Sequence, residues 1–397
     1  MIEKITGRHK FFIAMMFWSY IVLAVPYTVQ GSLAPVTMEF YGINAAQQGF
    51  ILTMQSVGGL CAALFIALKG EKYNKTNAIA FGLLIICLMT SAIGFAPAYG
   101  ALLALVAVLG VGVVFIDIMM NGAITDVYPK QKNTVLPLVH AFFSAGAMLT
   151  PVFVSVTSSP EDPGSFSRPF RIIGVVAAAV FILYLLSGKR IAAETPYRNM
   201  EAMKKRADEN PAEIFKTGRA WLFFVIGVLY FTFQFGTTMW LPTYAIRNAG
   251  VDFGTAGMML TAFFAGSLPM RFLGPLFLRR MSPRVLFSVF GWAAAALMTG
   301  ALFAGNVPLM LLLVAASGFM QGSSVASFIL MCNDTFPGRS ASASSLFSLA
   351  AGTATLTAPV WMGAMSEYLG FLVPMVLICV CMFLSAGMAF VQLRRKP

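Results

Sequence analysis

The chain has 397 residues, of which 58% are hydrophobic and 11% are charged. Soluble domains carry about 25% charged residues, so this composition disfavours a soluble protein and indicates one that folds in a lipid bilayer. The five cysteines stand apart in apolar runs, which disfavours a disulfide framework or a zinc site.

Uncharged runs fill most of the first half, and crossing a bilayer takes about 20 apolar residues. The first run follows a basic N-terminus that resembles the start of a signal peptide, but it is long and many others follow, so it predicts a span that stays in the membrane. The run 76–116 is of double length and contains Gly94 and Pro97, which predict a turn between two spans. The runs of this half are 11–38, 40–68, 76–116, 133–160 and 172–188.

A long polar segment, 189–219, divides the chain almost in half, and we interpret it as a solvated cytoplasmic linker. The run 285–333 breaks at Gly305 and Pro308 into two predicted spans. The later runs are 220–246, 253–270, 285–333, 340–366 and 368–393. The sequence therefore predicts an all-α membrane protein with twelve transmembrane helices, as a six-helix bundle in 1–188, the linker 189–219 and a second six-helix bundle in 220–397.

Positive charge is distributed unevenly between alternate loops. The formal net charge is +12, and one side of the predicted membrane receives all of the 27 Lys and Arg residues except Arg168, Arg171, Arg247 and Arg271. The positive-inside rule makes that side cytoplasmic, so we expect a multi-pass protein of the cell (inner) membrane with both termini in the cytoplasm. The charge thus needs no nucleic acid as a partner.

An internal repeat appears when the chain is shifted by 208 residues. Gly49-Phe-Ile-Leu-Thr-Met-Gln-Ser-Val-Gly-Gly-Leu60 then aligns with Gly257-Met-Met-Leu-Thr-Ala-Phe-Phe-Ala-Gly-Ser-Leu268, and Asp126-Val-Tyr-Pro129 with Asp334-Thr-Phe-Pro337. Both copies are expected to start on the cytoplasmic side, which predicts two bundles related by a parallel pseudo-two-fold repeat. Transporters place the solute site at such a repeat interface.

The chain resembles the major facilitator superfamily over essentially its whole length. The resemblance is carried by the six-plus-six spans and by the basic loop Ala67-Leu-Lys-Gly-Glu71-Lys72-Tyr-Asn74-Lys75, which is similar in degenerate form to the superfamily's Gly-x-x-x-Asp-Arg-x-Gly-Arg signature. The resemblance implies that this loop, with Glu71 and Lys72, is a gating latch that steadies the outward-open state. An ordinary positive-inside loop is the alternative.

Three shorter motifs resemble the fucose, galactose and glucose proton-symporter branch. Tyr230-Phe-Thr-Phe-Gln234 with Trp240-Leu-Pro-Thr-Tyr244 is similar to its span-7 pattern, Asp117-Ile-Met-Met-Asn121 to its span-4 segment, and Arg271-Phe-Leu-Gly274 to a span-8 element. Two positions depart from the branch: the second acid, expected near Gly31, is missing, and the polar pair of span 5 is His140 and Phe143.

Asp117 is the only carboxylate that the sequence embeds within a predicted span. An ionised carboxylate there costs about 2.5–3.5 kcal/mol on insertion scales, so it should face a wet cavity, pair with a cation or stay protonated. Asn121, four residues on, shares its helical face. We favour proton coupling for Asp117; substrate hydrogen bonding and a structural ion pair with Arg271 are the alternatives.

The other polar residues of the spans are candidates for binding the solute. His140 is a candidate because histidine is the residue type that changes charge in the physiological pH range. Arg271 is either a gating residue, as the branch implies, or a clamp for an anion. Pro242 should interrupt span 7. Amides can also be interhelical glue, and Trp240 an interfacial anchor. The predicted substrate-binding residues are Asn121, His140, Gln234, Trp240, Tyr27, Gln30, Gln55 and Gln321.

These features together predict a proton-coupled symporter that imports a small polar solute, such as a monosaccharide, by alternating access. The sequence holds no Walker loop, metal-ligand spacing or nucleophile elbow, so we expect a transporter that is not an enzyme, works as a monomer and needs neither cofactor nor metal. Proton-driven efflux of drugs or metabolites, an organic-anion carrier with Arg271 facing its cavity, and a non-transporting scaffold are the alternatives.

Overall fold

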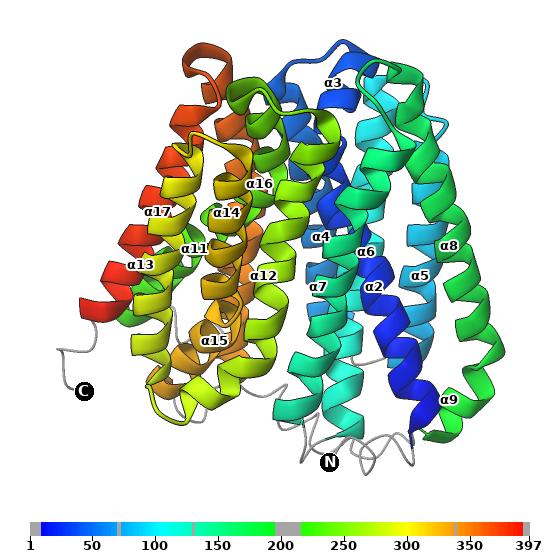
Figure 1. The fold of residues 1–397 in the computed structure, drawn as a ribbon. Helices are drawn as coiled ribbons and strands as arrows, with labels where there is room; N and C mark the ends of the chain where they lie inside the picture. The colour runs from blue at the N-terminus through cyan, green and yellow to red at the C-terminus, as the bar shows by residue number, and fades with distance from the viewer. Residues whose placement is uncertain (1–8, 70–72, 129–131, 195–215, 337–339, 392–397) are drawn as a thin grey trace. The chain divides into compact units, whose positions relative to one another are not determined.

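A computed structural model of the chain describes residues 9–69, 73–128, 132–194, 216–336 and 340–391. Within them the regular structure is helical, with one isolated bridge between Ser159 and Asp162 (Figure 1). Among the described residues, 11 helical segments are long and apolar enough to cross a membrane. The 30-residue helix α16 (Ser340–Leu369) supplies a further helix of sufficient length. The predicted all-α, twelve-helix class is confirmed.

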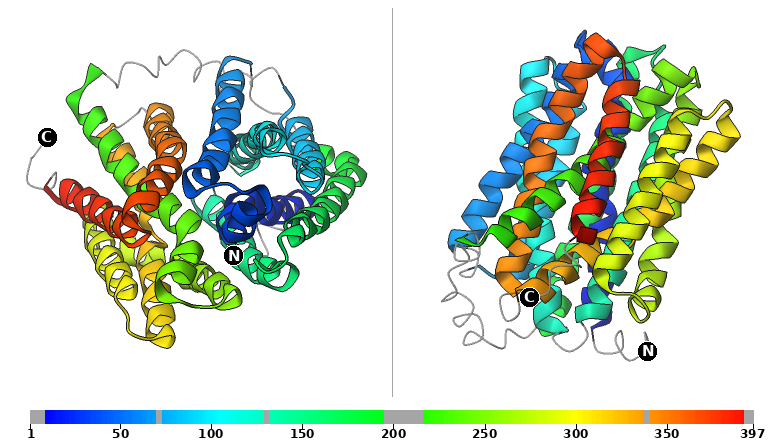
Figure 2. Two further views of the ribbon diagram at one scale, coloured as in Figure 1. Left: turned by 90° about the horizontal axis from the view of Figure 1, so that it is seen from above. Right: turned by 90° about the vertical axis from the view of Figure 1, so that its left-hand side faces the viewer.

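The chain divides into two compact units. Unit 1 comprises residues 1–42 and 51–203, and unit 2 comprises residues 43–50 and 204–397, so that the division falls inside the polar segment after the sixth span. The end-on view in Figure 2 shows the helices of each unit gathered side by side as a bundle. Each unit therefore has its own helical core.

Unit 1 holds the first eight described α-helices, apart from the start of α4. They are α2 (Lys10–Ser32), α3 (Ala34–Tyr41), α4 (Ala45–Lys69), α5 (Lys75–Ile93), α6 (Tyr99–Val127), α7 (Lys132–Thr157), α8 (Ser167–Leu186) and α9 (Gly188–Glu194). The first turn of α4 belongs to unit 2. The predicted turn at Gly94 and Pro97 is confirmed, because α5 ends and α6 begins on either side of it.

Unit 2 holds the remaining long helices. They are α11 (Gly218–Ala249), α12 (Phe253–Leu278), α13 (Pro283–Leu302), α14 (Val307–Gln321), α15 (Ser324–Thr335), α16 and α17 (Leu372–Val391). The turn predicted at Gly305 and Pro308 is confirmed between α13 and α14, where Asn306 caps α14 by accepting a hydrogen bond from the Leu309 N–H at 2.9 Å.

The 208-residue repeat reappears in the packing of helix pairs. In unit 1, a Cβ added at Gly58 would overlap the carbonyl of Ala107, and one added at Gly110 would overlap that of Gln55. In unit 2 the same two contacts recur at the shifted positions: Gly266 meets the carbonyl of Ala315, and Gly318 meets that of Phe263. Small residues let the backbones of α4 and α6, and of α12 and α14, approach closely in both units.

Two predicted helix boundaries are wrong. The single span expected over 11–38 is divided into α2 and α3 next to Leu33. The interruption expected at Pro242 is absent, since α11 runs through it from Gly218 to Ala249. Proline is tolerated inside membrane helices because neighbouring groups satisfy the backbone carbonyl that it leaves without a donor, and Pro26 and Pro359 also lie inside helices.

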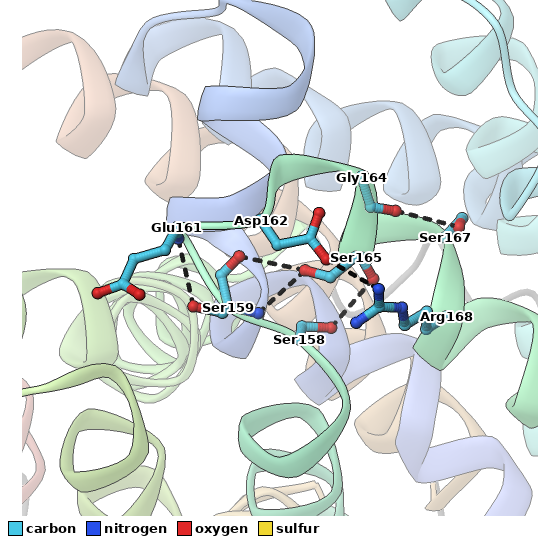
Figure 3. Close-up of polar contacts among 8 residues, drawn as sticks. All are labelled: Ser158, Ser159, Glu161, Asp162, Gly164, Ser165, Ser167 and Arg168. Atoms are coloured by element: carbon cyan, nitrogen blue, oxygen red, sulfur yellow. Dashed lines mark hydrogen bonds and ion pairs between the residues drawn. The ribbon is translucent and has the colours of Figure 1, made fainter.

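The loop between α7 and α8 is built from its own polar groups (Figure 3). The hydroxyl of Ser165 donates to the carbonyl of Ser159 at 3.1 Å and accepts the N–H of Ser159 at 2.9 Å. Arg168 pairs with Asp162 at 2.8 Å, but both side chains are at least half exposed, so the pair adds little stability. This loop is a structural connection rather than a site.

Candidate functional site

The predicted residues Asp117, Asn121 and His140 gather in unit 1 with Tyr20, and we call these four the Asp117 cluster. The side chain of Asn121 donates from Nδ2 to Asp117 Oδ1 at 3.1 Å. Its Oδ1 accepts the Tyr20 hydroxyl at 2.9 Å and lies 3.2 Å from His140 Nε2. The Tyr20 hydroxyl is also 3.5 Å from Asp117 Oδ1. The cluster is thus one hydrogen-bonded network centred on Asn121.

Three helices of unit 1 position this network. Asp117 and Asn121 are four residues apart on α6, so they lie one above the other on one face, as expected from the sequence. Tyr20 comes from α2 and His140 from α7, and their rings meet edge to face at 4.8 Å. Tyr20 is fully buried, whereas Asp117, Asn121 and His140 are partly buried. The carboxyl is therefore held by its hydrogen-bond partners in a residue that is partly buried.

Sequence reasoning did not identify Tyr20. It lies in the middle of a long apolar run, and a lone tyrosine there reads equally well as an interfacial or packing residue. Its only sequence signal is its depth, eleven residues into α2, where a phenolic hydroxyl needs a partner.

The other predicted residues of unit 1 flank the cluster. Tyr27, two turns along α2, packs its ring on Phe143 of α7 at 5.8 Å. Gln30 and Gln55 are buried, with 2% and 3% of their surface exposed. Neither amide atom of Gln55 has a hydrogen-bond partner among the described residues. A substrate role for these three residues stays a prediction.

Unit 2 contains a small pocket between α11, α12 and the α14–α15 pair, which we call the Arg271 pocket. Its polar lining is Tyr230, Gln234, Ser267, Arg271 and Gln321, and its apolar lining is Phe263, Phe264, Gly322 and Val325. The Tyr230 hydroxyl donates to Gln234 Oε1 at 2.8 Å. Three residues singled out from the sequence, Gln234, Arg271 and Gln321, therefore share one pocket.

The helix that carries Gln321 is interrupted at that residue. Helix α14 ends at Gln321, Gly322 and Ser323 form a turn, and α15 begins at Ser324. The run 285–333 gave no sign of this second break. Discontinuous membrane helices are typical of solute sites in transporters.

Trp240 and Tyr244 lie elsewhere in unit 2. Trp240 is 1% exposed, its indole N–H donates to the Pro359 carbonyl at 3.3 Å, and its ring packs on Phe371. The Tyr244 hydroxyl donates to the Leu302 carbonyl at 2.6 Å. Neither residue lines the Arg271 pocket. A substrate contact for Trp240 stays a prediction.

The two sites occupy corresponding levels of the repeat. Asp117 in α6 aligns at the 208-residue shift with Val325, and Val325 lines the Arg271 pocket. Arg271 in turn aligns with Ala63. Unit 1 therefore has a carboxyl group where unit 2 has an apolar residue, and unit 2 has a guanidinium group where unit 1 has an apolar residue. Such asymmetry between repeats points to function, because the shared fold requires neither charge.

Two predicted gating residues, Glu71 and Lys72, lie outside the described residues. The same is true of both ends of the chain. The latch role inferred for that loop stays a prediction.

Comparison with known proteins gives one family and one fold. The sequence model of the Major Facilitator Superfamily matches residues 11–284 and 246–397. "Inner membrane transport protein YdiN" of Escherichia coli (strain K12) is 22% identical over 346 residues, covering 83% of this chain and 77% of that protein. This family and this relative are transporters rather than enzymes.

Solved transporter structures share the fold. A bacterial homologue of the human lysosomal transporter Spinster superposes with a TM-score of 0.77 at 15% identity, covering 98% of this chain and 97% of that chain. A D-xylose-proton symporter superposes with a TM-score of 0.73 at 11% identity, covering 96% and 97% of the two chains.

Proposed function

The chain belongs to the Major Facilitator Superfamily, and we propose that it is a proton-coupled symporter of a small polar solute of monosaccharide size. In this proposal the protein lies in the inner membrane with both termini in the cytoplasm, and its two units alternate access to the solute. The observation that carries the proton coupling is the network around Asp117.

The Asp117 cluster suits reversible protonation. Desolvation disfavours an ionised carboxylate in general, whereas a hydrogen bond such as the one from Asn121 favours it. In this proposal Asp117 alternates between the protonated and the ionised state while Asn121 keeps it in place. His140 reaches the same network through Asn121 at 3.2 Å. A rearrangement that changes access to the cluster would therefore change its proton occupancy.

The solute would contact residues that surround these two sites. Asn121 and His140 in unit 1 and Gln234 and Gln321 in unit 2 offer amide and imidazole groups of the kind that bind hydroxyl-rich molecules. The D-xylose-proton symporter among the structures that share the fold is a transporter of this type.

The test is uptake by the full-length protein in reconstituted vesicles. Thermal-shift screening of sugars, organic acids and amino acids first supplies the solute. A pH gradient of one unit stores about 1.4 kcal/mol per proton, enough for about tenfold accumulation at one proton per solute. Wild-type vesicles should accumulate the solute when the gradient is imposed.

The variant Asp117→Asn separates coupling from binding. Its amide oxygen still accepts the Asn121 N–H, so the fold and solute exchange at equal concentrations should survive, while gradient-driven accumulation should fall to the equilibrium level. Accumulation by Asp117→Asn equal to that of the wild type would refute the proton role. Loss of exchange and accumulation together would assign Asp117 to solute binding instead.

A further inference from the structure

We propose that the Arg271 pocket binds a carboxylate group of the transported solute, so that the solute is a small organic anion such as a sugar acid or another hydroxy acid. The inference rests on the transport function proposed above and adds the charge of the substrate to it. It makes Arg271 a substrate-binding residue rather than a gate.

The position of Arg271 distinguishes it from the other cations in the described helices of unit 2. Arg219, Arg247 and Arg284 stand within the first or last turn of a helix, whereas Arg271 lies about two turns before the end of α12. Charged residues at depth in a membrane protein are costly and mark substrate or ion pathways. None of the described residues that line the pocket is acidic.

The pocket is rich in hydrogen-bond donors. Arg271 brings a planar fork of N–H groups, which matches the two oxygens of a carboxylate. Gln321 is 5% exposed, and its Nε2 has no hydrogen-bond partner among the described residues. Gln234 accepts the Tyr230 hydroxyl through its oxygen, so its N–H groups remain to donate elsewhere.

The chemistry of the donors favours an anion over a hydroxyl group. A buried N–H group without an acceptor is costly, and a carboxylate offers acceptors only. A hydroxyl would bring one more donor into a site that already has several. The pocket has about 10 Å³ of free space, roughly the room for one water molecule, so it holds one small group of the solute rather than a whole sugar ring.

The break between α14 and α15 lies directly beside the pocket, since Gln321 and Gly322 line it, whereas Ser323 and Ser324 do not. The buried hydroxyls of Ser323 and Ser324 have no hydrogen-bond partner among the described residues. Gly322 occupies the repeat position of Val114, which lies inside the unbroken α6. Because the shared fold does not require the break, we assign it to the pocket beside it.

Together the two sites predict the electrical character of transport. One proton on Asp117 and one monovalent anion at Arg271 move no net charge across the membrane. Accumulation should therefore follow a pH gradient and be insensitive to a potassium diffusion potential. Accumulation driven by the potential alone would overturn this pairing of one proton with one carboxylate.

The direct test is binding, which requires no gradient. Thermal unfolding of the purified full-length protein is measured with lactate, gluconate and glucuronate, and with the neutral counterparts propane-1,2-diol, sorbitol and glucose, at constant ionic strength. We expect at least one carboxylate to stabilise the wild type, and its neutral counterpart to have no effect.

Three variants locate the binding. Arg271→Gln should weaken carboxylate binding by at least about thirtyfold, the lower end of what truncating one partner of a buried charge pair costs. Gln321→Leu should weaken it by about tenfold, since it removes one hydrogen bond to a charged group. Arg247→Gln removes the same charge from the exposed end of α11 and should bind as the wild type does.

Each outcome decides the proposal. It is overturned if no carboxylate of the panel binds, if a neutral counterpart binds as tightly, or if Arg271→Gln binds like Arg247→Gln. If Arg271→Gln does not fold, Arg271→Lys keeps the charge without the fork; wild-type affinity in both Arg271→Lys and Gln321→Leu then overturns it. Arg271-dependent binding without proton-driven accumulation would support the anion site and refute only the proton coupling.

Discussion

Replacing Gly110 by alanine tests the close packing of α4 on α6, which recurs between α12 and α14 in the second unit. A Cβ at this position would lie within 3.0 Å of the backbone carbonyl of Gln55, a separation that Cβ atoms essentially never show. Because the obstacle is backbone, the two helices must separate by on the order of 1 Å before the methyl group fits into a close-packed interior. We expect Gly110→Ala to lower the free energy of unfolding by about 1–3 kcal/mol.

The assay is thermal unfolding of the purified protein, followed by the reaction of buried cysteines such as Cys332 with a thiol-reactive dye. For a unit of this size the expected loss corresponds to a fall in Tm of roughly 2–12 °C. Gly100→Ala is the matched control, since nothing lies within 4 Å of its added Cβ, and it should hold or raise the Tm. The repeat partner, Gly318→Ala, should behave like Gly110→Ala. A Tm for Gly110→Ala equal to that of Gly100→Ala would refute the packing argument.

Three further substitutions probe the network and the fold. Tyr20→Phe removes the hydroxyl that donates to Asn121 at 2.9 Å; it should cost about 1 kcal/mol of stability and slow initial uptake in vesicles, and unchanged uptake would exclude Tyr20 from the network's function. Tyr244→Phe leaves the Leu302 carbonyl without the hydroxyl at 2.6 Å and should lower the Tm through a cost of about 1–3 kcal/mol while uptake per folded molecule stays constant. Hydrogen bonds from Thr255 hold the pKa of Asp252, the cap of α12, below its usual value. The stability that the ionised Asp252 adds to the folded state is therefore present above the unfolded pKa and is lost as the pH falls through the lowered folded pKa. Asp252→Asn caps the helix without titrating, so its Tm should fall less on acidification than the Tm of the wild type. Equal falls in Tm would contradict the assignment.

The helical class and most of the spans were predictable because the bilayer imposes length and apolarity on every span. Gly94 and Pro97 located the turn between α5 and α6, because a turn outside the bilayer can use residues that break helices. The prediction at Pro242 failed, because proline inside a membrane helix is tolerated where neighbours satisfy the backbone.

Residues of the two candidate sites could be predicted where a charged or polar side chain stands out within an apolar span. Asp117 and Asn121 were identified by depth and by their four-residue spacing, and Arg271 by its charge. Tyr20 was missed because its partners come from α6 and α7, which are about 100 residues or more away in the chain. The break after Gln321 was missed because Gly322 and Ser323 sit in an apolar run, and glycine in such a run usually serves close helix packing.

In the mechanism proposed for this transporter, Asp117 is the group that exchanges the proton as solute binds. The most direct measurement is the number of protons taken up or released when solute is added to the purified protein in lightly buffered solution, followed with a pH indicator. Near neutral pH the wild type should show a proton change coupled to solute binding, and Asp117→Asn should bind the solute with no proton change. The same proton change in wild type and Asp117→Asn would contradict the claim.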